Sequence, residues 1–356
     1  MSASSRRPPL FVSSALLSAL CATLVSMTHA AFDPFAQELH ALERNPGMKL
    51  DLDWVRATRI NKSAVERRAA TIGTRRTVKK EWQAAWLLRA ITLIDLTTLM
   101  GDDTDTNVKR LCSKAMHPVR PDLLEALGAS ELGITTGAVC VYNPFVKTAV
   151  RALEGSGVPV AAVSTAFPAG LAPMKIRLEE VRASVSDGAS EIDMVITRGL
   201  ALGNHWEALY DEVQAVREAC GNSRLKVILG TGELATMTTV ARASLVAMMA
   251  GADFIKTSTG KETVNATLPI SLVMVRQVRA YLERTGYRVG YKPAGGIRSA
   301  KNALEYLFLM RDELGMPWLE PLLFRFGASG LLTDIERQLE HFVTGAYSGA
   351  YRHPMV

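Results

Sequence analysis

The sequence predicts a (β/α)₈ barrel that forms a single domain with an N-terminal helical extension. Two observations predict it: eight short apolar runs rich in β-branched residues recur from residue 91 onward, and amphipathic stretches of helical length separate them. Eight such units within about 250 residues also have the size of a closed barrel. The competing topology, an open doubly wound sheet, usually carries a glycine-rich dinucleotide turn after its first strand, and no such turn follows the first run here.

The expected strands follow one another at regular intervals along the chain. They are Ile91–Asp95, Ala138–Tyr142, Val158–Val163, Glu191–Ile196, Leu225–Leu229, Phe254–Lys256, Val289–Lys292 and Leu323–Phe326. Parallel strands need crossover connections, so we expect helices between them. In the stretch from Lys175 to Gly188, for example, Leu178, Val181 and Val185 recur at spacings of three and four residues. Gly188 then lies where helices commonly end in a left-handed residue.

Composition divides the chain into four parts. They are residues 1–47, a targeting-like or artefactual extension; residues 48–90, a charged helical segment; residues 91–345, the barrel; and residues 346–356, a C-terminal tail. The extension begins with Arg6 and Arg7, an apolar run and small residues near Ala30, which is the layout of a secretory signal. No acidic residue occurs before Asp33, which also fits an organellar transit peptide, and translation from Met48 is a third interpretation. Five serine and threonine residues within the run argue against stable membrane insertion.

Overall composition excludes several classes of protein. Apolar residues make up 48% of the 356 residues, enough to bury a sizeable core. The net charge of +6 is spread along the chain and forms no concentrated basic stripe, so we expect no nucleic-acid partner. The four cysteines form no paired motif and no metal spacing with the six histidines. A calcium-loop look-alike at Asp103–Asn107 has Val108 where glycine is required, so we expect no metal.

Polar and charged residues stand at the carboxyl ends of the expected strands, where barrels carry their catalytic groups. These residues are Asp95, Cys140, Asp193, Lys256, Lys292 and Arg325. One buried lysine and one aspartate would be interpreted as an ion pair. Two lysines change the interpretation, because neighbouring ammonium groups repel each other's protons and one amine can become a neutral nucleophile. A nearby aspartate then supplies counter-charge and relays protons, which is the requirement of amine catalysis.

Glycine-rich turns follow the last two expected strands. Gly295, Gly296 and Arg298 come after the seventh, and the stretch from Gly327 to Gly330, with Ser329, comes after the eighth. Barrels often bind phosphate in these two loops through backbone N–H groups and a short helix N-terminus. The alternative is that both are ordinary tight turns. The adjacent positions favour a phosphate site.

Five segments resemble, in the same order, those of deoxyribose-phosphate aldolases. They are Ile94–Thr98, Glu191–Val195, Phe254–Thr267, Gly290–Arg298 and Arg325–Ser329. A further stretch, Arg75–Trp86, resembles the animal type of this family, and the resemblance runs from about Leu50 to the C-terminus. It implies a class I, Schiff-base aldolase that reversibly cleaves 2-deoxy-D-ribose 5-phosphate to D-glyceraldehyde 3-phosphate and acetaldehyde. It implies no cofactor, a cytoplasmic protein unless residues 1–30 are a genuine targeting peptide, and a possible homo-oligomer.

The resemblance also implies roles for individual residues. Lys256 would carry the imine, Lys292 would perturb its pKa, and Asp193 would relay protons. The residues implied around the substrate and its phosphate are Lys261, Gly295, Gly296, Arg298, Ser329, Asp95 and Cys140, although a packed thiol is the alternative for Cys140. For Lys292 to keep its proton, we expect Asp193 to lie closer to Lys292 than to Lys256.

Three positions depart from the family pattern or extend it. Gly230 stands where bacterial relatives often have glutamate, and Gly330 stands where a hydroxyl residue is common. Tyr351 is a candidate for the C-terminal tyrosine that assists proton transfer in some members.

Two other functions stay open. One is another phosphate-binding Schiff-base barrel such as a transaldolase, which would not use acetaldehyde as donor, and the other is a non-catalytic barrel scaffold.

Overall fold

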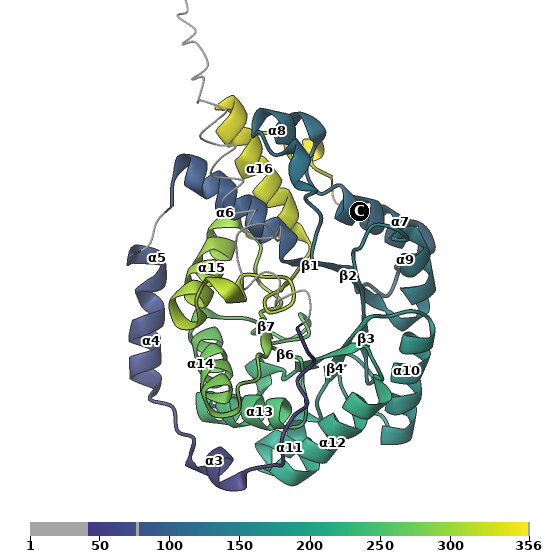
Figure 1. The fold of residues 1–356 in the computed structure, drawn as a ribbon, viewed down its shortest axis with the longest axis vertical. Coiled ribbons are helices and arrows are strands. Elements are labelled where there is room, and N and C mark those ends of the chain that lie inside the picture. Colours follow the sequence, from purple (N-terminus) through teal and green to yellow (C-terminus); the bar gives the residue numbers. More distant parts are fainter. Residues whose placement is uncertain (1–41, 76–77, 355–356) are drawn as a thin grey trace, which may run out of the picture.

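Eight parallel strands form the centre of the computed structural model, and helices surround them (Figure 1). The structure describes residues 42–75 and 78–354, so the predicted targeting segment lies outside the described residues. The strands are β1 Ile94–Thr97, β2 Ala138–Tyr142, β3 Val160–Ser164, β4 Glu191–Val195, β5 Arg224–Ile228, β6 Phe254–Lys256, β7 Gly290–Lys292 and β8 Phe326–Ala328. Each strand pairs with its neighbours in chain order, and β8 pairs with β1.

The sheet closes between β7 and β8. Tyr291 pairs with Phe324 and Ala294 pairs with Gly327, and both bridges are parallel. Backbone hydrogen bonds from Gly327 N to Pro293 O (2.9 Å) and from Arg325 N to Tyr291 O (3.2 Å) connect the same two edges. The closed order of eight parallel strands confirms the predicted (β/α)₈ barrel.

The helices that follow the strands cover the outside of the barrel (Figure 1). They are α7 Asp105–Met116, α8 Pro121–Ala126, α9 Val146–Ala152, α10 Met174–Ser186, α11 Arg198–Leu202, α12 Trp206–Ala219, α13 Met237–Met249, α14 Leu268–Thr285, α15 Ala300–Leu314 and α16 Gly330–Thr344. Helix α10 confirms a helix at the predicted segment, with Val181 buried and Leu178 and Val185 partly buried against the core. Gly188, two residues beyond it, has a φ of +102°. No helix in the described ranges combines the length and the apolar composition that crossing a bilayer requires.

Two of the eight predicted strands begin three residues later than predicted, whereas the bounds of the other six differ by at most two residues. Ile91 belongs to the preceding helix, α6 Lys80–Thr92, and β1 begins only at Ile94. At the other end, Leu323 and Phe324 lie in a turn, with both backbone N–H groups donating to the carbonyl of Glu320. All three residues are buried, and Phe324 also makes the single parallel bridge to Tyr291, but none of them belongs to a strand. Burial alone does not distinguish a strand from a buried turn or helix end.

Within the described residues, four helices precede the barrel strands: α3 Leu52–Ala57, α4 Lys62–Ala70, α5 Ile72–Arg75 and α6. The side chains of Asp51 and Asn61 accept hydrogen bonds from the first turns of α3 and α4, which fixes where these helices begin. Helix α4 packs against α14 from the outside of the helical layer (Figure 1). Helix α6 packs against both α15 and α16 and is buried from Ala84 to Ile91.

The chain just before these helices is anchored to the barrel through Asn45. Its side-chain amide donates to the carbonyls of Met248 (2.8 Å) and Ala252 (2.9 Å), and its oxygen accepts from the Tyr281 hydroxyl (3.1 Å). Asn45 N also donates to the carboxylate of Asp253 (3.0 Å). The last residues of the predicted extension are therefore part of the folded protein.

We expect Asn45→Ala to lower the free energy of unfolding by about 3 kcal/mol, because it leaves two buried carbonyls and a buried hydroxyl without their partner. Chemical denaturation would measure the loss. Asn222→Ala, the same change in an exposed turn, should change stability by less than about 0.5 kcal/mol. Equal effects from the two substitutions would contradict the anchoring role of Asn45.

Candidate active site

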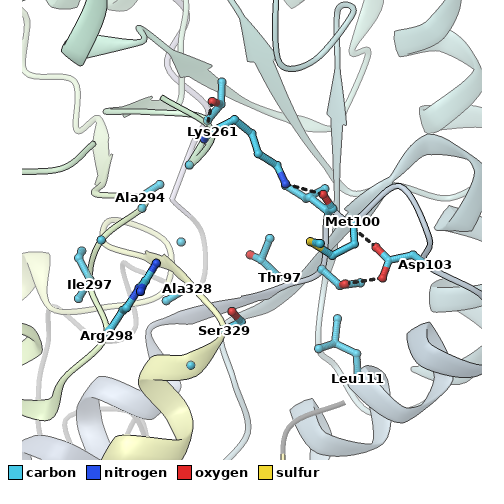
Figure 2. A pocket seen from close by; sticks show the side chains of 18 of the residues that line it. Thr97, Met100, Asp103, Leu111, Lys261, Ala294, Ile297, Arg298, Ala328 and Ser329 are labelled. Atoms are coloured by element: carbon cyan, nitrogen blue, oxygen red, sulfur yellow. Dashed lines mark hydrogen bonds between the residues drawn. The ribbon is translucent and has the colours of Figure 1, made fainter. Parts of the chain in front are cut away.

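A cavity of about 800 Å³ lies at the carboxyl ends of the strands. Loops after β1, β6, β7 and β8 form its walls, and the first turn of α16 contributes to it. The predicted site residues that line it are Lys256, Lys261, Gly295, Gly296, Arg298 and Ser329. Figure 2 shows the side chains of Lys261 and Arg298 reaching into this space from two different loops. The other predicted residues, Asp95, Cys140, Asp193 and Lys292, do not line it.

A network of seven buried charged side chains occupies the barrel interior beneath the cavity. Its members are Asp95, Glu191, Asp193, Lys226, Lys256, Lys292 and Arg325. Strand register brings them together: Lys256 pairs with Lys292 across β6 and β7, and Asp193 pairs with Lys226 across β4 and β5. Inward-facing side chains of neighbouring strands form layers in such barrels, so charges far apart in the sequence meet.

Asp193 is the common partner of the lysines. The Nζ atoms of Lys256 and Lys292 each lie 2.7 Å from its Oδ2 atom, and Lys226 Nζ lies 3.2 Å from Oδ1. The expectation that Asp193 is closer to Lys292 than to Lys256 is therefore wrong. What distinguishes the two lysines is Asp95, which accepts a further hydrogen bond from Lys292. Lys292 lies between two carboxylates, whereas Lys256 contacts one.

The two lysines consequently differ in basicity. Burial lowers the pKa of Lys256, and although Asp193 opposes this, the neighbouring Lys292 ammonium adds to the lowering. For Lys292, burial also acts downward, but Asp193 and Asp95 outweigh it and hold the pKa above the usual lysine value. Burial disfavours the charge on Asp193 as well, yet the three lysines around it hold the pKa of its carboxyl well below the normal range.

Three members of the network, Arg325, Lys226 and Glu191, were given no role by the sequence prediction. Arg325 donates to Asp95 and, at 2.9 Å, to Glu191. Lys226 donates to Glu191 and lies 3.4 Å from Asp95. Lys226 and Glu191 were not identified from the sequence, although each is a charge inside an apolar strand run, the same signal that identified Asp95. Asp95 itself contacts Lys292 and Arg325 and not the cavity expected to hold substrate.

Cys140 is a packed thiol in the structure. It is fully buried in a small apolar cluster with Leu99, Ala161 and Val163. Burial raises the pKa of this thiol, which therefore stays protonated near neutral pH. The structure thus places Cys140 beside the lysines and outside the cavity lining.

The glycine-rich loops form one side of the cavity. Gly295 and Gly296 have φ values of +77° and +81°, a left-handed conformation that favours glycine. Ser329 directly precedes the 15-residue helix α16 and makes no side-chain capping hydrogen bond, and Ser329 and Gly330 both line the cavity. Lys261 Nζ donates to the Leu99 carbonyl (2.9 Å; Figure 2). Backbone amides and two cations make this side suitable for a phosphate group.

Of the two glycine departures from the family pattern, the structure explains Gly230. A Cβ atom at Gly230 would lie 2.5 Å from Cδ of Arg198, whose guanidinium pairs with Glu233. Gly330 is the first residue of α16, and no atom lies within 4 Å of where its Cβ would be. Tyr351 is 85% exposed and does not line the cavity, so the structure does not place it with the lysines.

Comparison with known proteins identifies the family. Residues 89–309 match the DeoC/LacD family aldolase. The deoxyribose-phosphate aldolase of Homo sapiens is 59% identical over 313 residues, which cover 87% of this chain and 98% of that protein. That of Mus musculus is 60% identical over 311 residues, with the same coverage. The chain belongs to the DeoC/LacD aldolase family. A putative deoxyribose-phosphate aldolase from Toxoplasma gondii shares the fold, with a TM-score of 0.62 at 21% identity over 76% of this chain and 98% of that one.

Two neighbouring glycines after β7 allow a test of how this loop packs. Alanine at either position would strain a left-handed backbone by about 1–2 kcal/mol. At Gly295 the new Cβ would also lie 2.6 Å from Cγ of Asn265, whereas at Gly296 nothing lies within 4 Å. We expect Gly295→Ala to lower the unfolding temperature more than Gly296→Ala, as measured by calorimetry. A larger loss for Gly296→Ala would contradict the packing at this loop.

Proposed function

We propose that this protein is a class I aldolase that reversibly cleaves 2-deoxy-D-ribose 5-phosphate to D-glyceraldehyde 3-phosphate and acetaldehyde. One observation carries the assignment of the nucleophile: of the seven buried charged residues, Lys256 is the member that also lines the cavity. An amine at the floor of a cavity, with a lowered pKa, can attack an aldehyde bound above it. The animal relatives named as deoxyribose-phosphate aldolases support the substrate.

The reaction would begin with the neutral amine of Lys256 attacking the C1 aldehyde of the open-chain sugar. Loss of water gives a protonated imine, which withdraws electrons from the adjacent carbons. The C2–C3 bond then breaks, the C3 hydroxyl gives up its proton, and the bonding electrons form an enamine on Lys256. Glyceraldehyde 3-phosphate leaves. Protonation of the enamine at C2 and addition of water release acetaldehyde and restore the amine.

Asp193 and Lys292 would handle the protons in these steps. The Asp193 carboxylate lies 2.7 Å from both lysine Nζ atoms, so a proton can move between them through one group. Lys292 keeps its own charge because Asp95 is a second carboxylate partner. Its ammonium therefore helps to discharge Lys256 and to stabilise the negative charge that develops as water leaves.

The glycine-rich side of the cavity would hold the phosphate. Ser329 and the first amides of α16 offer hydrogen bonds, and Lys261 and Arg298 offer positive charge. A transaldolase-like reaction would use the same imine chemistry, but the relatives of about 60% identity named as deoxyribose-phosphate aldolases favour the two-carbon donor acetaldehyde. The network itself argues against an inert scaffold, because unpaired buried charge is costly.

The first prediction concerns the imine. Reduction with borohydride in the presence of acetaldehyde should label Lys256 and not Lys292, as located by peptide mass spectrometry. Lys256→Arg should abolish labelling, because a guanidinium stays protonated. Lys292→Leu should retain labelling only at raised pH, because removing this cation raises the pKa of Lys256 and the neutral amine then appears only above that higher value. Lys301→Arg, an exposed lysine on α15, serves as the control and should label normally.

Labelling of Lys292, or normal labelling of Lys292→Leu at neutral pH, would show that the roles of the two lysines are assigned wrongly. Loss of labelling in Lys301→Arg would show that the assay reports general damage to the protein.

The second prediction concerns the phosphate. Losing one charge-assisted hydrogen bond costs about 1.5–3 kcal/mol, so Lys261→Ala should lower kcat/KM for deoxyribose 5-phosphate by roughly 10–150-fold. The same variant should lower kcat/KM for unphosphorylated deoxyribose far less. Steady-state kinetics on both sugars would measure the difference, with Lys301→Ala as a matched surface control. Equal losses on the two sugars would exclude a phosphate role for Lys261.

A further inference from the structure

We infer that Arg325 and Glu191, which lie beneath the lysines and do not line the cavity, are positioning residues that determine how many protons the buried lysines hold. The network contains four basic groups and three carboxylates, so one amine has no carboxylate of its own. That amine is Lys256. This inference rests on the proposed function, in which Lys256 must be neutral to react.

Burial makes the balance between basic and acidic groups decisive. Every member of the network is at most 3% exposed, so water cannot compensate an excess charge. The bases are Arg325, Lys226, Lys256 and Lys292, and the acids are Asp95, Glu191 and Asp193. A guanidinium does not release its proton in proteins, so the positive charge of Arg325 always balances the negative charge of one carboxylate. Two carboxylates then remain for three lysines.

The contacts decide which lysine is left neutral. Lys226 Nζ contacts Glu191, Asp193 (3.2 Å) and Asp95 (3.4 Å). Lys292 contacts Asp95 and Asp193. Lys256 contacts Asp193 alone among the three acids, and it shares that oxygen atom with Lys292. The lysine with the fewest carboxylate partners loses its proton at the lowest cost, and it is the one that reaches the cavity.

The position of the Arg325 charge is built into the fold. Its Nε atom donates to the Pro321 carbonyl, and its other nitrogens donate to Asp95 and Glu191. Gly137, just before β2, leaves room for the side chain, because a Cβ atom there would lie 3.2 Å from Cδ of Arg325 and 2.8 Å from the Thr92 carbonyl. The guanidinium is therefore held against two of the three acids.

Three groups act on Lys256 directly: Asp193 of β4, Lys292 of β7 and Cys140 of β2. Asp95 of β1, Glu191 of β4, Lys226 of β5 and Arg325 before β8 are linked to it through the ion pairs of Asp193 and Lys292. Lys261 and Arg298 line the cavity with it. Burial keeps the Cys140 thiol neutral by raising its pKa, so this group does not alter the count. Lys261 and Arg298 lie at the cavity and outside the sealed network.

Two substitutions should then act in opposite directions. Arg325→Met leaves three bases and three acids, so Lys256 keeps its proton to higher pH. Glu191→Gln leaves four bases and two acids, so Lys256 loses its proton at lower pH. The double variant leaves three bases and two acids, so the bases again outnumber the acids by one, as in the native protein. A purely structural role would give no such pattern, since both single changes would impair the site in the same way.

The experiment follows the rate of Lys256 labelling by acetaldehyde and cyanoborohydride between about pH 5 and pH 9, with circular dichroism to verify folding. We expect the midpoint of the pH profile to rise by about one unit in Arg325→Met and to fall by about one unit in Glu191→Gln, each a roughly tenfold change in neutral amine. The double variant should return close to the native midpoint. Arg325→Lys, which retains the charge, should stay near it.

The outcomes separate this inference from the proposed function. The role of Arg325 and Glu191 would be overturned if the labelling midpoint moved in the same direction in both single variants. It would also be overturned if the midpoint of the double variant did not return to the native value. If Arg325→Met does not fold, an unmoved midpoint in Glu191→Gln overturns it, and a downward shift together with a native-like Arg325→Lys supports it. Absence of any Lys256 adduct in the native protein would overturn the proposed function instead.

Discussion

The carboxylate of Asp193, shared by two lysine ammonium positions inside a dry barrel, is the interaction on which the rest of the site depends. Its Oδ2 atom lies 2.7 Å from the Nζ atoms of both Lys256 and Lys292, and a single negative charge cannot fully compensate two positive ones. In water this competition would matter little, because solvent screens the charges. Inside the barrel it makes the protonation of Lys256 depend on every other charge in the interior.

The fold provides both the closeness and the dryness that this requires. Parallel register brings β6 and β7 lysines side by side, and ring closure between β7 and β8 brings Arg325 to the acids of β1 and β4. Small residues make room for the long side chains: a Cβ atom at Gly327 would lie 3.3 Å from Cε of Lys292. The interior therefore gives up apolar packing for a buried ionic network, which a protein selected for stability alone would gain little by keeping.

The sequence predicted the topology and the upper half of the site for a physical reason that also explains what it missed. The alternation of short apolar runs with helical stretches predicts the strand order, and a charge within an apolar run predicts an inward-facing charge. Asp95, Lys256 and Lys292 could therefore be recognised as site residues. Lys226 and Glu191 also carry a charge within an apolar run, but a criterion of strand carboxyl ends does not select Glu191, the first residue of β4, or Lys226, the middle residue of β5. The equal distances to Asp193 depend on side-chain positions, which pattern and spacing do not contain. The apolar runs also predicted the starts of β1 and β8 too early, because an apolar run buried in a helix end or a turn has the same composition as one buried in a strand.

The placement of the phosphate side follows from the same electrostatics. A phosphate group brings negative charge into the cavity, and close to Lys256 that charge would favour the protonated, unreactive amine. In the proposed function, the glycine loops and the α16 N-terminus would hold it at the β7 and β8 wall, where backbone amides, Lys261 and Arg298 would compensate it locally. Lys261, held by the Leu99 carbonyl, adds positive charge without joining the network below. Binding energy from the phosphate can thus position the aldehyde over Lys256 while the charge of the phosphate is kept from the amine.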